Sequence, residues 1–337
     1  MNYDEKRKEY LEGVKNIFPG LRFKFGTAVF NPEKSTGPTS GKIELNGQFL
    51  NEEALKDGPV QFMHYTSLNS AMNILNSGNV RLYNCFNLND PNEINYFLDQ
   101  YPIKFEAKEI KQYKREHFIL SGCKYTDESD EDYNLWRLYG DSGKGVGIVF
   151  EIDDKIKNWS HLFLQHVSYG KADNKTTEFL NYHVEFNKKH NLFQNKPAFF
   201  SLLATAVKNE LWSIEKEFRI VVKCPFNQRT LKDENRILAS NPLIGETIKH
   251  EIKSDGKMVS YVELPLSFTA HKGKDMKVQL EDGKTVDLHD YVPNLKIKEI
   301  IFGPNNPLKM SDVVHYMNWK SSELDYIFKF RESSIKF

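Results

Sequence analysis

The amino-acid sequence predicts an α+β fold, and the order of its elements is the reason. A strand, a helix and a second strand can be identified between residues 60 and 84, and a helix, a glycine turn and a strand follow between residues 130 and 152. Strand-like stretches then adjoin one another in the second half of the chain. Because helices and strands do not alternate regularly, we expect a mixed α+β arrangement rather than a doubly wound parallel sheet.

Composition sets the limits within which a function can be sought. The 337 residues are enough for one elaborated domain. The 46 basic and 46 acidic residues cancel, so overall charge gives no argument for a nucleic-acid partner. No apolar run approaches the roughly 18 to 20 residues that span a bilayer, and the charged start of the chain lacks the apolar stretch of a secretory signal. We therefore expect a cytoplasmic protein that does not bind membranes.

The cysteines and histidines do not predict a metal site. Cys85, Cys123 and Cys224 lie far apart in strand-like apolar stretches and form no Cys-x-x-Cys pair. The ten histidines are scattered along the chain. We expect buried, reduced thiols and no metal cofactor.

The chain is expected to begin with an accessory N-terminal segment, residues 1–58. This segment is polar and rich in Gly, Pro, Asn and Lys, with one amphipathic stretch at 10–17 and one hairpin-like stretch at 43–50. Residues 59–337 are expected to form the main domain.

The main domain is predicted to open with a strand at 60–65, a helix and another strand. The helix is indicated by apolar residues spaced i, i+3, i+4 and i+7, namely Leu68, Ala71, Met72 and Leu75. Ser67 suits the N-cap of this helix, and Gly78 suits the position after its end. The next strand alternates over 80–84 and leads to an Asn-Asp-Pro turn at 89–91.

Four elements are expected in the middle of the chain. The pattern predicts a charged helix at 104–116, a strand at 118–123, a helix at 130–140 that ends at a glycine, and an alternating strand at 146–152. An acidic run at 127–132 lies at the start of the second helix. Carboxylates there favour the positive end of the helix dipole, so a capping role is favoured over a metal site or a basic partner.

The second half is expected to contain one long helix and several strands. The helix would begin near Pro197 and is predicted by the apolar stripe Phe200, Leu203, Ala204, Val207 and Leu211. The strand at 217–224 then places Glu217 and Arg219 on one face and apolar residues on the other. Further strands are expected at 296–302 and at 261–268, where Pro265 indicates the edge of a sheet.

Polar, aromatic and glycine residues gather in four clusters at the expected ends of these elements. Reactive groups in such places can converge on a cleft, so the clusters predict an active site assembled from distant segments. The clusters are His64-Tyr65-Thr66-Ser67, Asn87 to Glu93, Trp136 to Gly145, and Glu215 to Arg219.

Taken alone, each cluster also has a structural explanation. A Glu217–Arg219 surface network is about as good an interpretation as a catalytic carboxylate, and a lone histidine at a strand end, such as His64, is more often structural. Trp136 and Tyr139 lie three residues apart on one helix, which core packing would explain.

Two of the clusters are turns that need no ligand. The glycine-rich turn at 140–145 follows a helix and precedes a strand, the reverse of a nucleotide-hydrolase P-loop. We expect a tight connection there, with Lys144 near the mouth of the cleft. Residues 87–93 can be read as an Asx-Pro turn and the start of a helix, although Asn89 and Asp90 could still orient neighbours in the cleft.

Together and in this order, the clusters resemble a bacterial family known as domain of unknown function 2971. The resemblance spans roughly residues 60–305 and rests on His64-Tyr65-Thr66, Leu88-Asn89-Asp90-Pro91, Trp136-x-x-Tyr139-Gly140 with Gly145-Val146, Glu215 to Arg219, and Ile300-Ile301-Phe302-Gly303-Pro304. That family in turn resembles ADP-ribosyltransferase folds, including DNA-modifying toxins of the DarT kind, through a His-Tyr-Thr strand and a later Glu. This second resemblance implies an ADP-ribosyltransferase-like split sheet core with flanking helices.

The second resemblance also implies NAD as a co-substrate and assigns roles to particular residues. His64 would hold the adenosine-side ribose, Tyr139 together with Tyr65 would stack on the nicotinamide, and Glu217 would bind the nicotinamide ribose and steer transfer. Arg219 could meet the pyrophosphate or an acceptor phosphate. The other residues expected to contact NAD are Thr66, Asn89, Asp90 and Lys144.

The implied function is an NAD-dependent ADP-ribosyltransferase of a bacterial toxin or anti-phage defence system. Its acceptor would be nucleic acid, RNA or DNA, rather than protein, and an antitoxin is a further possible partner. Two groups of basic residues could form patches for a phosphate backbone, although lysine runs are more often solvated faces. The first is Lys111, Lys114 and Arg115, and the second is Lys253, Lys257, Lys272 and Lys274. Two alternatives stay open: NAD hydrolysis without transfer, and a non-catalytic sensor or binding module.

Overall fold

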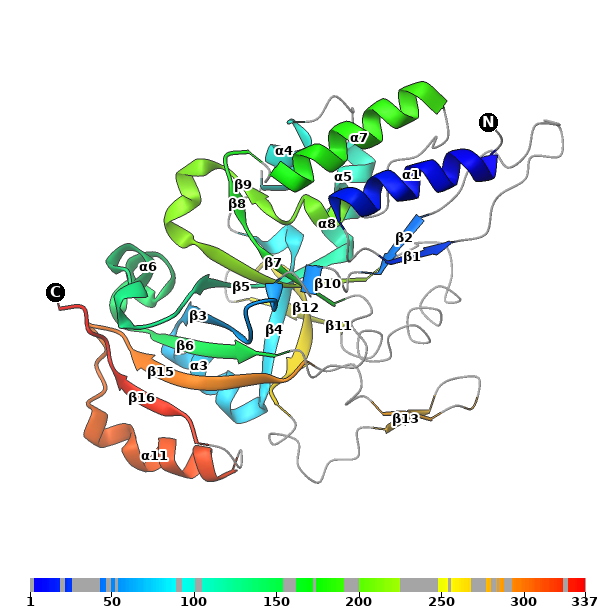
Figure 1. Ribbon diagram of the computed structural model, residues 1–337. Coiled ribbons are helices and arrows are strands. Elements are labelled where there is room, and N and C mark those ends of the chain that lie inside the picture. Colours follow the sequence, from blue (N-terminus) through cyan, green and yellow to red (C-terminus); the bar gives the residue numbers. More distant parts are fainter. Residues whose placement is uncertain are drawn as a thin grey trace.

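The computed structural model describes most of the chain at the level of single residues. The described residues are 3–18, 22–25, 43–46, 50–51, 54–88, 93–100, 105–153, 162–171, 174–190, 200–224, 248–253, 256–267, 277–279, 283, 285–287, 293–323 and 327–336. Within these ranges, ten strands form one mostly antiparallel sheet that is flanked by helices (Figure 1). The α+β prediction is therefore confirmed.

The large sheet is a continuous path of eight strands with two more attached to its middle. The path runs β11 (Ile248–Ile252), β12 (Met258–Pro265), β4 (Asn79–Asn84), β5 (His117–Lys124), β3 (Val60–Thr66), β6 (Val146–Ile152), β15 (Leu295–Phe302) and β16 (Lys329–Glu332). Strand β10 (Glu217–Lys223) pairs with β5, and β7 (Leu162–His166) pairs with β10. Only the β15–β16 pair in this sheet, as described, is parallel.

The sheet forks at β5. Strand β4 pairs with β5 at residues 118 and 119, and β3 pairs with it at residues 123 and 124. Because β10 occupies the other edge of β5 along residues 117–123, β3 and β4 must share the remaining edge. The two strands therefore separate beside residues 120–122 and leave a gap in the sheet.

One face of the sheet is covered by a continuous apolar core. Even-numbered residues of β5 and β10, among them Phe118, Leu120, Phe218 and Ile220, point into this core. The helices α3 (Leu68–Ser77) and α11 (Met310–Glu323) supply its other half. Burial of this many aliphatic and aromatic side chains is the main driving force for the fold.

The opposite face carries two separate apolar groups. One lies under α1 (Tyr3–Ile17), α4 (Glu93–Leu98), α7 (Asn174–His190) and α8 (Phe200–Leu203), and the other lies under α6 (Tyr133–Tyr139). Along β5, Ile119 belongs to the first group and Cys123 to the second. Ser121 lies between them, so polar residues fill the strip of sheet that neither group covers.

The N-terminal helix is packed against the rest of the chain. α1 and α7 lie side by side in Figure 1 and bury Tyr10 and Val14. The Tyr10 hydroxyl is 2.8 Å from Nδ1 of His183 on α7. Asn51 hydrogen bonds to the backbone of β7 through both its amide atoms. The boundary predicted after residue 58 remains a prediction, but the segment before it shares a core with the main sheet.

Several local predictions are confirmed by the backbone. Ser67 caps α3 by accepting a hydrogen bond from the Ser70 amide, and Gly78 follows the helix with φ of 67°. Asp132 from the acidic run caps α6 by accepting from two backbone amides. The three cysteines are buried and free, as expected.

The long helix predicted from Pro197 is wrong within the described residues. α8 ends at Leu203, and Val207–Lys208 form a short strand, β9, that pairs in parallel with β8 (Ser168–Tyr169). A 3-10 helix, η4 (Glu210–Glu215), follows, and Asn209 caps it. The apolar stripe that suggested a helix is therefore divided among three elements, and Leu211 is 87% exposed.

The edge position predicted for β12 is also wrong. This strand lies between β11 and β4, and Pro265 is its last residue, opposite Asn79. A proline at the end of an inner strand removes one donor without interrupting the pairing, so its presence did not mark an edge.

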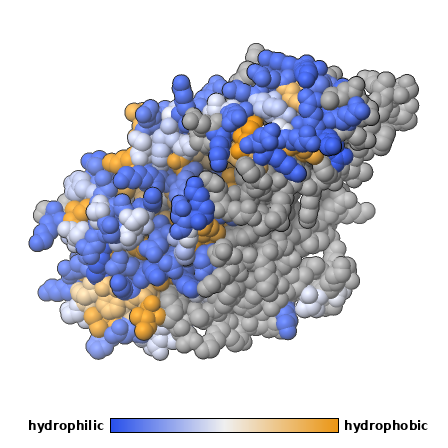
Figure 2. All heavy atoms as spheres, in the orientation of Figure 1, coloured by the Kyte–Doolittle hydropathy of each residue, from blue (hydrophilic) through white to orange (hydrophobic). Residues whose placement is uncertain are grey.

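The remaining described elements and surface need only brief mention. They include α5 (Ala107–Glu116) and two small antiparallel pairs, β1 (Arg22–Phe25) with β2 (Ile43–Asn46) and β13 (Lys277–Gln279) with β14 (Thr285–Asp287). The face seen in Figure 2 is mainly hydrophilic where it is coloured, with some hydrophobic residues gathered at the lower left. Within the described residues, every helix is too short or too polar to cross a membrane.

The glycine turn that follows α6 packs directly against the end of β15. The amide of Gly303 donates to the carbonyl of Gly145 at 3.0 Å, and that of Asn305 donates to Gly143 at 2.9 Å. A Cβ on Gly145 would collide with the carbonyl oxygen of Thr66 in β3. Glycine is thus required here by the close approach of two backbones.

We predict that Gly145→Ala destabilises the protein by about 3 kcal/mol, because the methyl group has to displace backbone rather than a flexible side chain. Gly256→Ala is the control: its site is open but has a positive φ of 78°, so we expect about 1 kcal/mol. Urea unfolding of both variants measures the difference, and equal losses would contradict the packing explanation.

A second prediction concerns acid stability. Burial lowers the pKa of His183 from 6.5 to about 4, so the unfolded chain takes up this proton at a higher pH than the folded one. The contribution of the neutral imidazole to the free energy of unfolding is complete above about pH 6.5 and is lost as the pH falls towards 4, and it amounts to about 3 kcal/mol. His183→Gln should flatten the stability curve between these pH values. An unchanged slope in the variant would show that other groups cause the loss.

Candidate active site

A cavity of about 290 Å³ opens where β3 and β4 separate. Its floor is formed by the stretch of β5 that pairs with neither β3 nor β4 and by the start of β10. One wall carries His64 and Tyr139, and the other carries Arg81 and Tyr83 of β4. The volume is near the lower end of the ~300–1,000 Å³ range of small-molecule pockets, so the cavity can enclose one end of a nucleotide, and the rest of a larger ligand would extend past its rim.

The pair Glu217–Arg219 forms the centre of the floor. The two residues alternate on one face of β10, as predicted, and the guanidinium binds the carboxylate through Nε at 2.8 Å and Nη2 at 2.9 Å. The remaining guanidinium nitrogen, Nη1, contacts the Glu93 carboxylate and the carbonyl of Thr205. Arg219 is 1% exposed, so it holds the floor together and has little freedom to meet a ligand phosphate.

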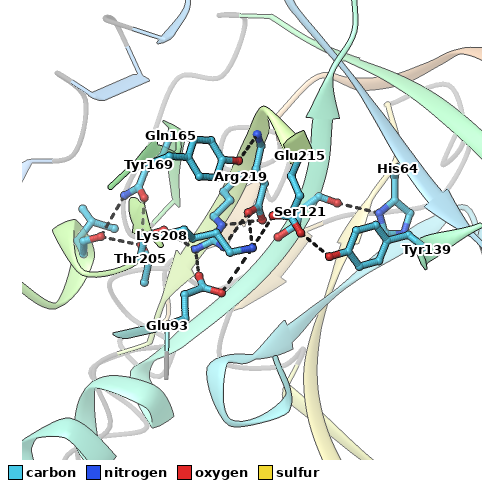
Figure 3. Close-up of polar contacts among 12 residues, drawn as sticks. His64, Glu93, Ser121, Tyr139, Gln165, Tyr169, Thr205, Lys208, Glu215 and Arg219 are labelled. Carbon is cyan, nitrogen blue, oxygen red and sulfur yellow. Dashed lines mark hydrogen bonds and ion pairs between the residues drawn. The ribbon is translucent and has the colours of Figure 1, made fainter. Parts of the chain in front are cut away.

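Two further residues reach this pair from other elements. Lys208 projects from β9, and its Nζ lies 2.6 Å from Glu215 and 3.0 Å from Glu217 (Figure 3). Glu93, the first residue of α4, lies 3.8 Å from the same ammonium group. All five side chains are buried, so a network of three carboxylates and two cations lies beneath the cavity.

The charges of this network do not balance. With every group ionised, three carboxylates face two cations, which leaves one excess negative charge. Burial opposes ionisation of Glu217, but Arg219 and Lys208 outweigh it and lower the pKa of this carboxyl to about 2. For Glu215, burial and the neighbouring Glu217 raise the pKa against the attraction of Lys208. Glu217 is therefore the fixed anion of the network, and Glu215 is the carboxyl that can exchange a proton.

Tyr139 connects this network to α6. Its hydroxyl donates a short hydrogen bond to Glu215, and burial together with this bond raises the pKa of Tyr139. The ring lines the cavity at the end of the helix. Trp136, one turn earlier, is fully buried, and its ring lies nearly perpendicular to that of Tyr65, with centroids 4.8 Å apart. Core packing thus explains Trp136, whereas Tyr139 is available to a ligand.

His64 sits in the fork of the sheet. Its Nδ1 lies 2.8 Å from the carbonyl oxygen of Ser121, and since a carbonyl can only accept, Nδ1 carries the proton. Burial lowers the pKa of His64, and the hydrogen bond to Ser121 opposes this only in part. The neutral imidazole leaves Nε2 as an acceptor, and no hydrogen bond is made by this atom to any described residue. It can accept a hydrogen bond from a ligand hydroxyl.

The structure brings together only some of the residues expected to contact NAD. His64, Tyr65, Tyr139, Glu217 and Arg219 line the cavity. Thr66 and Lys144 do not: Thr66 pairs with Val146 in the sheet, and the backbone of Lys144 is held by Asn306. Asn89 and Asp90 lie outside the described residues.

Three members of the buried network were given no role by sequence reasoning. Lys208 lies within the predicted long helix but is not part of its apolar stripe. Asn209 could have indicated that the helix does not continue through Lys208, because asparagine favours the N-cap position and here caps η4. Glu215 and Glu93 lay inside the predicted clusters, but contacts between elements far apart in sequence were needed to show that they face the same lysine.

Comparison with known proteins supports one part of the expected resemblance. Residues 135–220 match the family model described as "Protein of unknown function (DUF2971)". The resemblance to that family is thus confirmed over a segment that contains most of α6, the glycine turn and the first four residues of β10. No curated protein and no solved structure matches the chain. Within the described residues, no group of His, Cys, Asp and Glu side chains is placed to hold a metal ion.

We predict that Lys208→Met lowers the free energy of unfolding by about 3 to 5 kcal/mol, because it leaves buried carboxylates without their counter-charge. Adding Glu215→Gln to this variant should restore part of the loss, because it removes the excess anion. Urea unfolding at pH 7 of the two single variants and the double variant measures the coupling.

Lys249→Ala is the control for this cycle. Lys249 pairs with Glu263 at 2.6 Å but is 51% exposed, so its removal should cost less than about 1 kcal/mol. Strictly additive losses at Lys208 and Glu215 would show that the two groups do not act as one network.

Proposed function

From the match to the DUF2971 family over residues 135–220 and from the chemistry of the cleft, we propose that this protein is an NAD-dependent ADP-ribosyltransferase. It would serve a bacterial toxin or anti-phage defence system and modify RNA or DNA rather than protein. The matched family has no assigned activity, so the proposal rests on the side chains that line the cavity. NAD is the co-substrate, and the transferred group is ADP-ribose.

The observation that carries this proposal is the buried network with its excess negative charge. The nicotinamide ring of NAD is a cation, and rupture of its bond to the ribose develops positive charge on the sugar. A preorganised carboxylate in a site that excludes water stabilises such charge more than water does. Glu217 meets this need because Arg219 fixes its orientation and the low pKa keeps it ionised at neutral pH.

Glu215, which accepts a hydrogen bond from Tyr139, supplies the proton transfer. In the reaction, the bond between ribose C1′ and the nicotinamide nitrogen breaks, and its electron pair leaves with nicotinamide. A nucleophilic nitrogen or oxygen of the acceptor forms the new bond to C1′, and its proton passes to the Glu215 carboxylate. A base with a raised pKa is better matched to neutral pH than an ordinary glutamate.

Two neighbours orient the sugar and the ring. The free Nε2 of His64 can accept a hydrogen bond from a ribose hydroxyl, and the ring of Tyr139 can stack on a flat heterocycle. Both residues project from regular elements, β3 and α6. Binding of the ligand therefore costs little conformational entropy of these side chains.

The test is incubation of the purified protein with NAD labelled in its adenylate half, together with RNA, single-stranded DNA, double-stranded DNA or cell lysate. We expect label on nucleic acid and release of nicotinamide. Glu217→Gln should lower the rate by about 10²- to 10³-fold, as for loss of one preorganised charge contact. Glu299→Gln is the control, since Glu299 also binds an arginine, Arg331, but on the far strand β15.

The outcomes separate the alternatives. Nicotinamide release without label on any acceptor would show hydrolysis, with water in place of the acceptor. Label confined to protein would overturn the preference for nucleic acid. Absence of both label and nicotinamide would overturn the enzymatic proposal and leave a binding module.

A further inference from the structure

The cations that line the cavity differ in whether a carboxylate already neutralises them. Lys208 and Arg219 belong to the buried network, and Arg81 binds Glu251 at 2.8 Å. Lys253 also lines the cavity. No carboxylate in the described part of the chain forms an ion pair with it.

The position of Lys253 is set by an aromatic ring. The residue directly follows β11, and its Nζ lies over the ring of Tyr83, 4.6 Å from the centroid. Tyr83 projects from β4 on the side of the cavity away from His64, and its cross-strand neighbour is Tyr261. A cation–π contact of this kind localises the ammonium group without neutralising it. As far as the described residues go, the N–H donors of Lys253 therefore stay available to a ligand.

The cavity thus has two electrostatic ends. Its floor carries an excess of negative charge over Glu215 and Glu217, which repels phosphate and attracts a cationic ring. Its rim carries Lys253, which no carboxylate of the described residues neutralises. A ligand with one positive end and phosphate groups further along would fit this order, and the reverse orientation would place phosphates over carboxylates.

We propose that Lys253 is the residue that binds the phosphate groups of the ligand in this cleft, a dinucleotide whose cationic base lies over the acidic floor. The assignment rests on the proposed function and deepens it. It specifies how NAD is oriented in the cleft, with nicotinamide over the floor and the phosphates at the rim. It also takes the role that the sequence suggested for Arg219, whose donors are directed to Glu217, Glu93 and Thr205.

A small dinucleotide fits this position better than a nucleic-acid backbone. Binding to a polymeric backbone uses several lysines or arginines spaced along a surface. Here one lining cation, Lys253, has no carboxylate partner among the described residues, and Arg81, which lines the same wall, is paired with Glu251.

The test compares three ligands that share the cationic ring and differ in phosphate. Dissociation constants for NAD, nicotinamide mononucleotide and nicotinamide riboside are measured by calorimetry with the full chain and with Lys253→Ala, Lys253→Arg and Lys249→Ala. We expect Lys253→Ala to weaken NAD about tenfold, as for loss of one charged hydrogen bond. Nicotinamide riboside, which has no phosphate, should bind the variant as it binds the wild type.

The controls make the result specific. Lys253→Arg should restore most of the affinity for NAD, and Lys249→Ala, which removes the same charge from β11 outside the cavity, should leave it unchanged. Equal binding of NAD by wild type and Lys253→Ala overturns the assignment alone. An equal loss for all three ligands also overturns it. A wild-type protein that binds none of them overturns the proposed function, and the assignment falls with it.

Discussion

The site depends on one interaction, the bidentate bond between Arg219 and Glu217 on a strand buried on both faces. A guanidinium and a carboxylate lose their hydration there, and the cost is offset only because every charged atom has a close partner. Thr205, Glu93 and Lys208 supply those partners from three separate segments. The pair therefore ties α4, β9 and the turn after α8 to the central strand, and the shape of the cavity floor follows from this requirement.

Local structure was predictable from the sequence wherever a residue type strongly favours one structural position, such as a helix cap. Ser67, Gly78 and Asp132 specify helix ends through their own side chains or backbone, and the alternation of β10 specifies which residues share a face. The fold class followed from the order of such elements. The sequence also predicted that His64, Tyr139 and Glu217 share one cleft, because each lies at or near the end of an element.

What could not be predicted depends on contacts between distant segments. The stripe from Phe200 to Leu211 has helical spacing, but the partner that makes Val207 and Lys208 a strand is β8, some forty residues earlier in the chain. Pro265 gave no information on strand order. A proline is excluded from the middle of an inner strand because it lacks an N–H donor, but at the end of β12 this loss does not interrupt the pairing. The charge excess beneath the cavity is likewise a property of five residues from four elements, and no one motif contains it.

The fork in the sheet has a further consequence for what the cleft can recognise. Beside residues 120–122, β5 faces the opening with its peptide groups rather than with another strand, and His64 already uses the carbonyl of Ser121. A bound molecule would meet main-chain atoms there, and these are the same whatever side chain a position carries. Substitutions can therefore alter the rim, and with it the choice of ligand, while the polypeptide backbone at the base keeps one unchanging set of contacts.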